Sequence, residues 1–355
     1  MPAGMRDEIT IEELLQLRES APVTTIDVRS PSEFADGTIP GSVNIPLFDD
    51  EERAQVGTVY KQIGVKEAKR LGLEIVSRKL PELVGRFERL EGEKAVFCWR
   101  GGMRSKSVTT VLSLMGIRAY RIIGGYRAYR RKVVESLEQF DLKPECIVVG
   151  GLTGTGKTRV LRLLKSQGYP VLDLERMAGH RGSVFGHVGL RPNNQKTFDA
   201  LLFEELRVLN HRPYVLMEGE SRRIGKAVMP EFLARAKESG RHIHLVLPLE
   251  ARVRNILADY DPSGHADELL GAFRRIKPSI HTPVARDIEQ SLAEARYEDA
   301  VRLLLQFYYD RKYGHAMDRS AAEPVTIEAA DVRDAAEKVR RQLAAWGFGD
   351  PETPR

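Results

Sequence analysis

The stretch from Cys98 to Ser105 constrains this chain more than any other, because it joins a cysteine to a loop with two adjacent glycines. The run Lys94–Phe97 leads into the cysteine, and the residues from Ser105 to Leu112 are typical of a helix. A strand that delivers a cysteine into a glycine-rich loop just before a helix surrounds the sulfur with backbone N–H donors. These donors and the helix dipole favour an anion at this place, either the thiolate or an oxyanion beside it.

Two arginines, Arg100 and Arg104, add positive charge to this loop. Two chemistries fit the pattern: sulfur or selenium carried on Cys98, or a phosphate that Cys98 attacks. The alternative is a buried structural cysteine at the end of a strand, but that alternative explains neither the glycines nor the arginines. The loop therefore predicts Cys98 as a catalytic nucleophile assisted by Arg100 and Arg104.

The segments around this loop resemble the rhodanese domain, in order and spacing, over residues 10–135. A short buried strand at Thr24–Val28 ends in the Asp27-x-Arg29 pair, turn residues follow it, and Gly124–Gly125 permits a tight chain reversal near the cysteine loop. Thr38 departs from the pattern, because many rhodaneses have histidine there, and we take this position as structural. Asp27 and Arg29 are expected to form a stabilising ion pair rather than to take part in catalysis.

A second phosphate-type loop lies in the other half of the chain. The apolar run Glu145–Gly150 enters Gly151–Thr158, and apolar residues with helical spacing follow, which satisfies G-x-x-x-x-G-K-[ST] in its strand–loop–helix context. Successive N–H groups of such a loop wrap a diphosphate, its lysine reaches the charge, and its last hydroxyl is placed to bind Mg²⁺. The predicted phosphate-binding residues are Gly151, Gly154, Gly156, Lys157 and Thr158, and Mg²⁺ at Thr158 is the one metal that the sequence suggests.

The acidic partner of this loop is less well defined. A nucleotide hydrolase usually has a strand that ends in an acid, which holds Mg²⁺ through water. Here Glu218 and Glu220 follow the apolar run from Tyr214, and Asp173 ends another short apolar run. None is the usual aspartate after four apolar residues, so the loop predicts a bound di- or triphosphate rather than ATP hydrolysis. The general acid or base stays open among His180, Glu218 and Glu220.

Composition and length predict an α/β enzyme of two domains. A chain of 355 residues is long enough for two cores, which we place at 1–137 and 138–355, each with βαβ architecture and a parallel sheet. Helical periodicity in 266–345 predicts a helical C-terminal portion. Only two cysteines occur, and Cys146 falls inside a strand, so a disulfide scaffold and a cysteine metal site are excluded. No apolar run approaches the ~20 residues of a membrane span, and the N-terminus has no signal-like segment, so we expect a cytoplasmic protein.

The positive net charge of the chain suggests an anionic partner. The formal net charge is +5 and the sequence pI about 9.1. Arginine-rich clusters are accompanied by Tyr120, Tyr126, Tyr129 and Phe185, a mixture typical of sites where phosphates are neutralised and bases stacked. Ordinary solvated helix faces are the alternative for part of these residues, which are Arg118, Arg121, Arg127, Arg130, Arg131, Lys132, Arg176, His180, Arg181, Arg191, Lys196, Arg222, Arg223, Lys226, Arg274, Arg275 and Lys277.

The order of the two loops in one chain resembles the tRNA 2-selenouridine synthase family, over about residues 10–310. Cys98–Ser105, Gly151–Thr158, His180–Ser183 and Glu218–Ser221 carry the resemblance. It implies that 2-thiouridine at the wobble position of tRNA is alkylated by geranyl diphosphate, and that selenium from selenophosphate then displaces the S-geranyl group. The implied partners are tRNA and an enzyme that supplies selenophosphate. The oligomeric state stays open.

Site chemistry assigns a role to each loop under this resemblance. Cys98 is the natural selenium carrier, because a covalent relay divides one difficult step into two. Arg100, Arg104 and the loop amides would hold selenophosphate and stabilise the departing phosphate. The Gly151–Thr158 loop would hold the diphosphate of geranyl diphosphate, with Lys157 on the leaving group, so no ATP requirement is expected.

Two rival functions fit part of the sequence. One is a rhodanese-type sulfurtransferase or phosphatase fused to a small-molecule kinase, since the spacing from Cys98 to Arg104 also fits an arginine-assisted phosphatase loop. The other is a non-enzymatic tRNA-binding protein that retains two anion sites, although intact Cys98, Lys157 and Thr158 argue against it.

Overall fold

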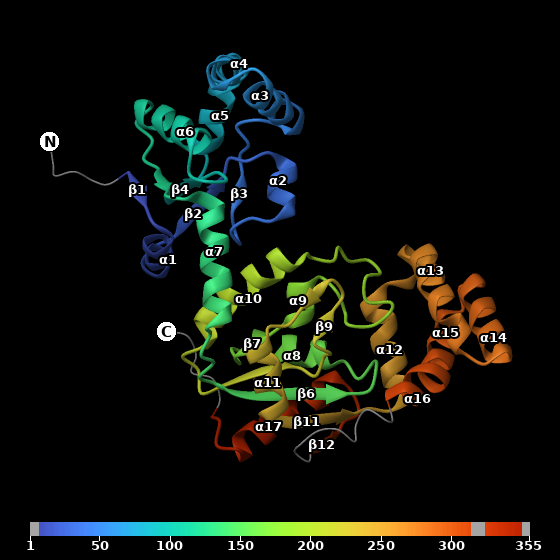
Figure 1. Ribbon diagram of the computed structural model, residues 1–355. Helices are drawn as coiled ribbons and strands as arrows, with labels where there is room; N and C mark the ends of the chain where they lie inside the picture. The colour runs from blue at the N-terminus through green and yellow to red at the C-terminus, as the bar shows by residue number, and fades with distance from the viewer. Residues whose placement is uncertain (1–6, 314–323, 350–355) are drawn as a thin grey trace. The chain divides into compact units, whose positions relative to one another are not determined.

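The computed structural model describes residues 7–313 and 324–349, and its first compact unit ends at Gln139. This unit is built on a five-stranded parallel sheet in the order β1-β5-β4-β2-β3 (Figure 1). Its strands are β1 (Glu8–Ile9), β2 (Val23–Asp27), β3 (Val43–Asn44), β4 (Glu93–Phe97) and β5 (Tyr120–Ile122). Its helices are α1 (Ile11–Ser20), α2 (Pro31–Asp36), α3 (Asp50–Gln62), α4 (Val65–Ser77), α5 (Leu80–Glu88), α6 (Met103–Leu114) and α7 (Gly125–Glu138).

Strand β4 lies inside this sheet, and its alternating side chains enter two apolar layers. Val96 and Cys98 pack with Phe87 of α5 and Leu112 of α6 on one face. Ala95 and Phe97 point to the opposite face, where α1 contacts α7, and both are fully buried. Because both faces of β4 are buried, the C-terminal end of this strand holds Cys98 in a fixed position beside the start of α6.

The second unit begins at Phe140 and contains another parallel sheet, in the order β12-β11-β6-β8-β7. Its strands are β6 (Glu145–Gly151), β7 (Val171–Leu172), β8 (Tyr214–Glu218), β11 (Arg241–Val246) and β12 (Val325–Glu328), and a separate two-stranded ribbon is formed by β9 (Arg223–Ile224) and β10 (Ala227–Val228). The helices that alternate with these strands along the chain are α8 (Lys157–Ser166), α9 (Leu174–Ala178), α10 (Gln195–Leu209), α11 (Glu231–Ser239), α12 (Leu249–Tyr260) and α17 (Val332–Ala345).

A helical region follows α12 (Figure 1). It has its own apolar core. It contains α13 (Ala266–Ile276), α14 (Thr282–Ala293), α15 (Tyr297–Leu304), a π-helical turn at Leu305–Tyr309 and α16 (Asp310–Tyr313), with short 3₁₀ turns at Pro262–Gly264 and Lys277–Ser279. The two-unit α/β architecture with parallel sheets and a helical C-terminal portion is confirmed.

One element in that portion was predicted wrongly. Residues 266–345 were expected to be helical throughout, but Val325–Glu328 forms β12, which pairs in parallel with β11. Four residues are too few to show a periodicity, and the neighbouring edge of β11 determines their conformation. Residues 314–323 of the predicted helical portion lie outside the described residues.

Cys146 is buried near the start of β6, as predicted, and burial raises the pKa of its thiol to about 11. Within residues 7–313 and 324–349, no helix combines the length and the apolar character that crossing a bilayer requires.

Candidate active sites

The cysteine loop runs from the end of β4 to the start of α6, whose N-cap is Gly102. Two close backbone approaches explain its glycine requirement. A Cβ at Gly125 would lie 2.1 Å from the Cys98 carbonyl oxygen, and one at Gly101 would lie 2.6 Å from the Ile122 carbonyl oxygen. Both glycines also have positive φ, +56° and +63°. The Gly124–Gly125 reversal therefore packs directly against the cysteine loop, as the sequence predicted.

Cys98 itself is only 3 % exposed, and its Sγ lies 3.3 Å from the Ser105 hydroxyl. Ser105 is in the first turn of α6, so this hydroxyl and the start of the helix face the same sulfur. Trp99 and Met103 of the loop are exposed, at 40 % and 57 %, and so is Arg100. The sulfur is thus buried in a loop that presents both apolar and basic side chains to solvent.

The two arginines of the loop differ in their surroundings. Arg100 is exposed, whereas Arg104 makes a two-point ion pair with Glu33 of α2. Burial raises the pKa of the Glu33 carboxyl, but the hydrogen bond and charge of Arg104 outweigh it and leave that pKa below its usual value. Glu33 therefore remains a carboxylate that fixes the guanidinium of Arg104 near the loop.

The Asp27–Arg29 pair is a buried structural element. The Arg29 guanidinium contacts both Asp27 oxygens, donates to the Gly37 carbonyl at 2.6 Å, and lies 4.2 Å from the ring centre of Tyr126. Thr38 donates its hydroxyl to Asp27 at 2.9 Å. These contacts are those of a stabilising ion pair, and Thr38 completes them instead of facing Cys98.

The P-loop connects β6 to α8, and its three glycines lie against neighbouring backbone and side chains. Gly151, Gly154 and Gly156 have positive φ, and a Cβ at any of them would lie within 2.9 Å of another heavy atom. Lys157 donates to the Gly151 carbonyl at 3.1 Å, so its ammonium group lies over the loop. The chain thus holds the loop in the conformation that directs N–H groups towards a phosphate.

Helix α12 fixes the other side of the P-loop. Arg252 donates to the Thr153 carbonyl at 2.9 Å and Asn255 to the Gly154 carbonyl at 3.0 Å. Arg252 is 5 % exposed and also makes two hydrogen bonds with Asp310, at 2.6 and 3.0 Å. The loop is therefore joined through one arginine to the helical region.

Carboxylates gather at the start of α8. Thr158 donates its hydroxyl to Glu175 at 2.8 Å, and Glu218, fully buried, accepts the Leu174 N–H at 3.1 Å. Asp173 is the N-cap of α9 and pairs with Arg162 at 2.9 Å, so structural partners occupy its carboxylate. The carboxylate that accepts the Thr158 hydrogen bond is therefore Glu175. The sequence prediction did not include Glu175, because it named only Asp173, at the end of the preceding apolar run.

Burial and mutual repulsion raise the pKa values in this group. The pKa of Glu175 is raised to about 7, first by burial and then by the charges of Glu220 and Asp173. The pKa of Glu218 is also raised, by burial and by Asp173 and Glu175. Glu220 is half-buried, and its carboxylate lies near Gly182. Burial and the neighbouring carboxylates therefore favour the protonated forms of Glu175 and Glu218.

His180 lies apart from these hydrogen bonds. Its Nδ1 accepts the Gly182 N–H at 3.1 Å, and burial, with the neighbouring charges of His187 and Arg181, lowers its pKa. A neutral ring that accepts a backbone hydrogen bond is fixed in place, as expected of a residue that shapes its loop.

Comparisons with known proteins assign both units. Residues 10–132 match the rhodanese-like domain, and residues 144–270 match the tRNA 2-selenouridine synthase AAA domain. The tRNA 2-selenouridine synthase of Bdellovibrio bacteriovorus is 33 % identical, over 90 % of this chain and 95 % of its own length. That of Pseudomonas syringae is 34 % identical, over 84 % and 90 %. The chain belongs to the tRNA 2-selenouridine synthase family.

A solved structure also matches this member of the tRNA 2-selenouridine synthase family. It is the N-terminal domain of a Clostridium difficile protein, 38 % identical to this chain, with a TM-score of 0.34 and coverage of 36 % of this chain and 98 % of that one.

The oxygen atoms around Thr158 determine whether a divalent cation fits this family member. The described residues contain no group of three or more His, Cys, Asp or Glu side chains that encloses a metal. Mg²⁺ at a phosphate site needs only one or two protein oxygens, because phosphates and water supply the rest. Thr158 and Glu175 offer such oxygens, and within the described chain Glu218 has a buried Oε1 without a hydrogen-bond partner. The residues fit a Mg²⁺ that arrives with a diphosphate.

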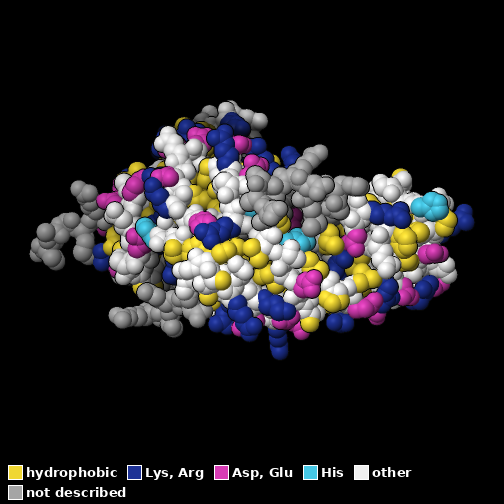
Figure 2. Space-filling model, turned by 90° about the horizontal axis from the view of Figure 1, so that it is seen from below, with side chains coloured by type: hydrophobic (Ala, Val, Ile, Leu, Met, Phe, Trp, Pro, Cys, Tyr) yellow, Lys and Arg dark blue, Asp and Glu magenta, His cyan; other side chains and the backbone are white. Residues whose placement is uncertain are grey.

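The basic clusters of this family member are divided between paired and unpaired residues. On the face drawn in Figure 2, Lys and Arg side chains lie among Asp and Glu side chains. Those with acidic partners are Arg118, Arg121, Lys132, Arg176, Arg222 and Lys277. In the part of the chain that the structure describes, the side chains of six exposed residues of these clusters enter no ion pair and no hydrogen bond, namely Arg127, Arg131, Arg191, Arg223, Lys226 and Arg274. These six are the better candidates for contacts with nucleic-acid phosphates.

Proposed function

We propose that this protein converts 2-thiouridine at the tRNA wobble position into 2-selenouridine, in two steps on two loops. In the first step the thiouridine sulfur attacks C1 of geranyl diphosphate, the C–O bond breaks, and pyrophosphate leaves. In the second step selenium from selenophosphate enters at C2, and the C2–S bond breaks so that geranylthiol leaves. What supports this is membership of a family whose relatives are named for 2-selenouridine synthesis, in a chain with both loops intact.

Alkylation in the first step converts the sulfur at C2 into a better leaving group. A thione sulfur leaves C2 poorly, whereas an S-geranyl group departs as a thiol. The P-loop N–H groups and Lys157 would stabilise the charge that develops on the pyrophosphate. Mg²⁺ bound through Thr158 and Glu175 would supply further positive charge there. No γ-phosphate takes part, so ATP is not required.

Selenium capture is assigned to Cys98. Selenium in selenophosphate already has the oxidation level of selenide, so a selenosulfide on Cys98 needs an oxidant to form and a thiol to release selenium. Attack of the Cys98 thiolate on phosphorus needs neither, since selenide leaves with the P–Se electron pair and water later removes the phosphate. Protein denatured after reaction with selenophosphate keeps radioactive selenium in the first route and radioactive phosphorus in the second.

Two features around Cys98 support a role in donor capture. The start of α6 and the Ser105 hydroxyl face the sulfur, and Glu33 holds Arg104 beside the loop. Arg100 is exposed and would reach the donor from solvent. Selenophosphate itself would come from an enzyme that makes it, and a tRNA substrate places the reaction in the cytoplasm.

Mass spectrometry of wobble nucleosides tests the proposal as a whole. Cells that lack the gene should lose 2-selenouridine and keep 2-thiouridine, and the wild-type gene should restore the selenium nucleoside. Unchanged nucleosides would reject the proposal. Purified protein that geranylates 2-thiouridine only when ATP is present would reject the assignment of geranyl diphosphate to the P-loop.

A further inference from the structure

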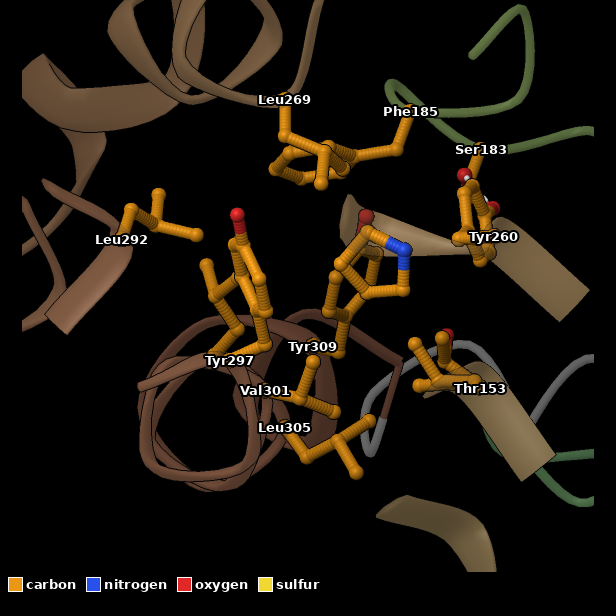
Figure 3. Close-up of a pocket in the computed structure, with 13 residues that line it drawn as sticks. Thr153, Ser183, Phe185, Tyr260, Leu269, Leu292, Tyr297, Val301, Leu305 and Tyr309 are labelled. Carbon is orange, nitrogen blue, oxygen red and sulfur yellow. Dashed lines mark hydrogen bonds between the residues drawn. The ribbon is translucent and has the colours of Figure 1, made fainter. Parts of the chain in front are cut away.

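An apolar cavity opens beside the P-loop in the helical region of the second unit (Figure 3). It contains about 550 Å³ of space outside the protein atoms, part of it open to solvent. Aromatic and branched aliphatic side chains form nearly all of its walls. Nothing in the sequence motifs pointed to this cavity, because its lining comes from several separate segments.

The walls come mainly from α12, α13, α14, α15, the π-helical turn and the loop before α10. Figure 3 shows Val301 and Leu305 on one side of the space, with Leu269 and Phe185 facing them. A π-turn adds a residue to the helix and is frequent at functional sites. Here it spans Leu305–Tyr309 and places two of its side chains, Leu305 and Tyr309, in the wall.

One end of the cavity is the P-loop itself. Thr153 lines the space on the side opposite Leu292 (Figure 3). Arg252 holds the Thr153 carbonyl and, through Asp310, the end of the π-turn. The phosphate loop and the cavity wall are therefore fixed to each other by one buried guanidinium.

Two polar groups of the lining satisfy each other. The hydroxyls of Ser183 and Tyr260 lie 3.1 Å apart and form a hydrogen bond, and the Arg181 guanidinium lies 4.6 Å from the Tyr260 ring centre, with its N–H groups bound to backbone carbonyls. The other polar side chains of the lining, Thr153, Tyr297 and Tyr309, offer only hydroxyl groups, which are few for the edge of a nucleoside base. A hydrocarbon chain needs only apolar contact.

We propose that this cavity binds the hydrocarbon chain of a prenyl diphosphate whose diphosphate lies in the P-loop. The proposal rests on the proposed function, and it adds the site that selects the chain. A ligand with an anionic head and an apolar tail requires a phosphate loop continuous with an apolar cavity, and Thr153 is the point at which the two meet. The depth of the cavity then sets the chain length that the enzyme accepts.

Direct binding tests this with purified full-length protein and two probes, geranyl diphosphate and inorganic pyrophosphate. At ~0.8 kcal/mol per buried CH₂, burial of about three to four of the geranyl carbons should make the wild type bind geranyl diphosphate about a hundredfold more tightly than pyrophosphate. Val301→Trp fills the cavity and should reduce this preference to about threefold, with pyrophosphate affinity unchanged. Val208→Trp, at an exposed position of α10, is the matched control and should behave as wild type.

A second variant keeps the test decisive where the tryptophan prevents folding. Val301→Ala enlarges the cavity and should shift the preference from geranyl towards farnesyl diphosphate, by about tenfold in the ratio of the two affinities. Equal affinity of the wild type for geranyl diphosphate and pyrophosphate would overturn the proposal, as would a chain preference that neither Val301 variant changes. A wild type that binds neither probe would reject the diphosphate assignment of the P-loop, and this proposal with it.

Discussion

The cysteine loop and the P-loop are built alike and surrounded differently. Each follows the central strand region of a parallel sheet, contains glycines with positive φ, and leads into a helix whose N-terminus favours an anion. The Ser105 hydroxyl lies beside Cys98, and Arg104 at the start of α6 pairs with Glu33, whereas buried carboxylates and an apolar cavity border the P-loop. The backbone thus makes both loops candidate anion sites, and under the proposed function the side chains around them determine what each anion is attached to.

The largest expected effect separates the two loops chemically. Cys98→Ala should abolish selenation but leave geranylation, because the P-loop does not depend on the thiol, so S-geranyl-2-thiouridine accumulates in tRNA. Nucleoside mass spectrometry after reaction with both co-substrates measures this. Cys146→Ala is the control, since that cysteine is buried core in β6. Loss of both steps in Cys98→Ala would mean that the loops are not independent.

Lys157→Ala should produce the reverse pattern. Removing the ammonium group takes charge stabilisation from the leaving pyrophosphate, which should slow geranylation about a hundredfold. Selenation of a tRNA oligonucleotide that is already geranylated should continue at the wild-type rate. Lys165→Ala, on the same helix but paired with Glu205, controls for loss of a lysine from α8. Normal geranylation by Lys157→Ala would show that the loop holds some other ligand.

The third prediction concerns the contribution of Arg104 to the binding of selenophosphate at the cysteine loop. Arg104→Ala should weaken the apparent affinity for selenophosphate about tenfold or more, because a charge-assisted hydrogen bond contributes roughly 1.5–3 kcal/mol. Geranylation kinetics should not change. Arg53→Ala is the matched control, since Arg53 also lies near Glu33, at 3.6 Å, but outside the loop. An unchanged donor affinity in Arg104→Ala would leave Arg104 with a structural role only.

The last prediction concerns the stability of the fold at the P-loop, and not a rate or an affinity. Because the pKa of Glu175 is raised from 4.5 to about 7, folded protein binds this proton more tightly than unfolded protein, and wild-type stability falls as pH rises through that range. Glu175→Gln removes this loss, so its stability advantage should grow between pH 4.5 and 7 to about 2–4 kcal/mol.

Chemical denaturation at several pH values measures this advantage. Exposed Glu238, replaced by Gln, is the control and should give no such trend. Added Mg²⁺ with pyrophosphate should stabilise the wild type more than Glu175→Gln. A stability difference that stays constant with pH would remove the raised pKa as its cause.

The sequence by itself determined both loops, the two parallel sheets and the buried role of Cys146. Their signals are local, since the glycine spacing, the strand before each loop and the helix after it lie within about twenty residues of one another. The Asp27–Arg29 pair was predictable for the same reason.

Only the tertiary structure decided which carboxylate meets Thr158, where Arg104 is held, and that an apolar cavity borders the P-loop. Glu175 and Thr158 are brought together by β6, α8 and α9, and the cavity wall joins residues from Thr153 to Tyr309. Strand β12 was missed because pairing with β11, and not its own four residues, makes it a strand. Contacts between distant segments depend on packing, and one sequence carries no local pattern for them.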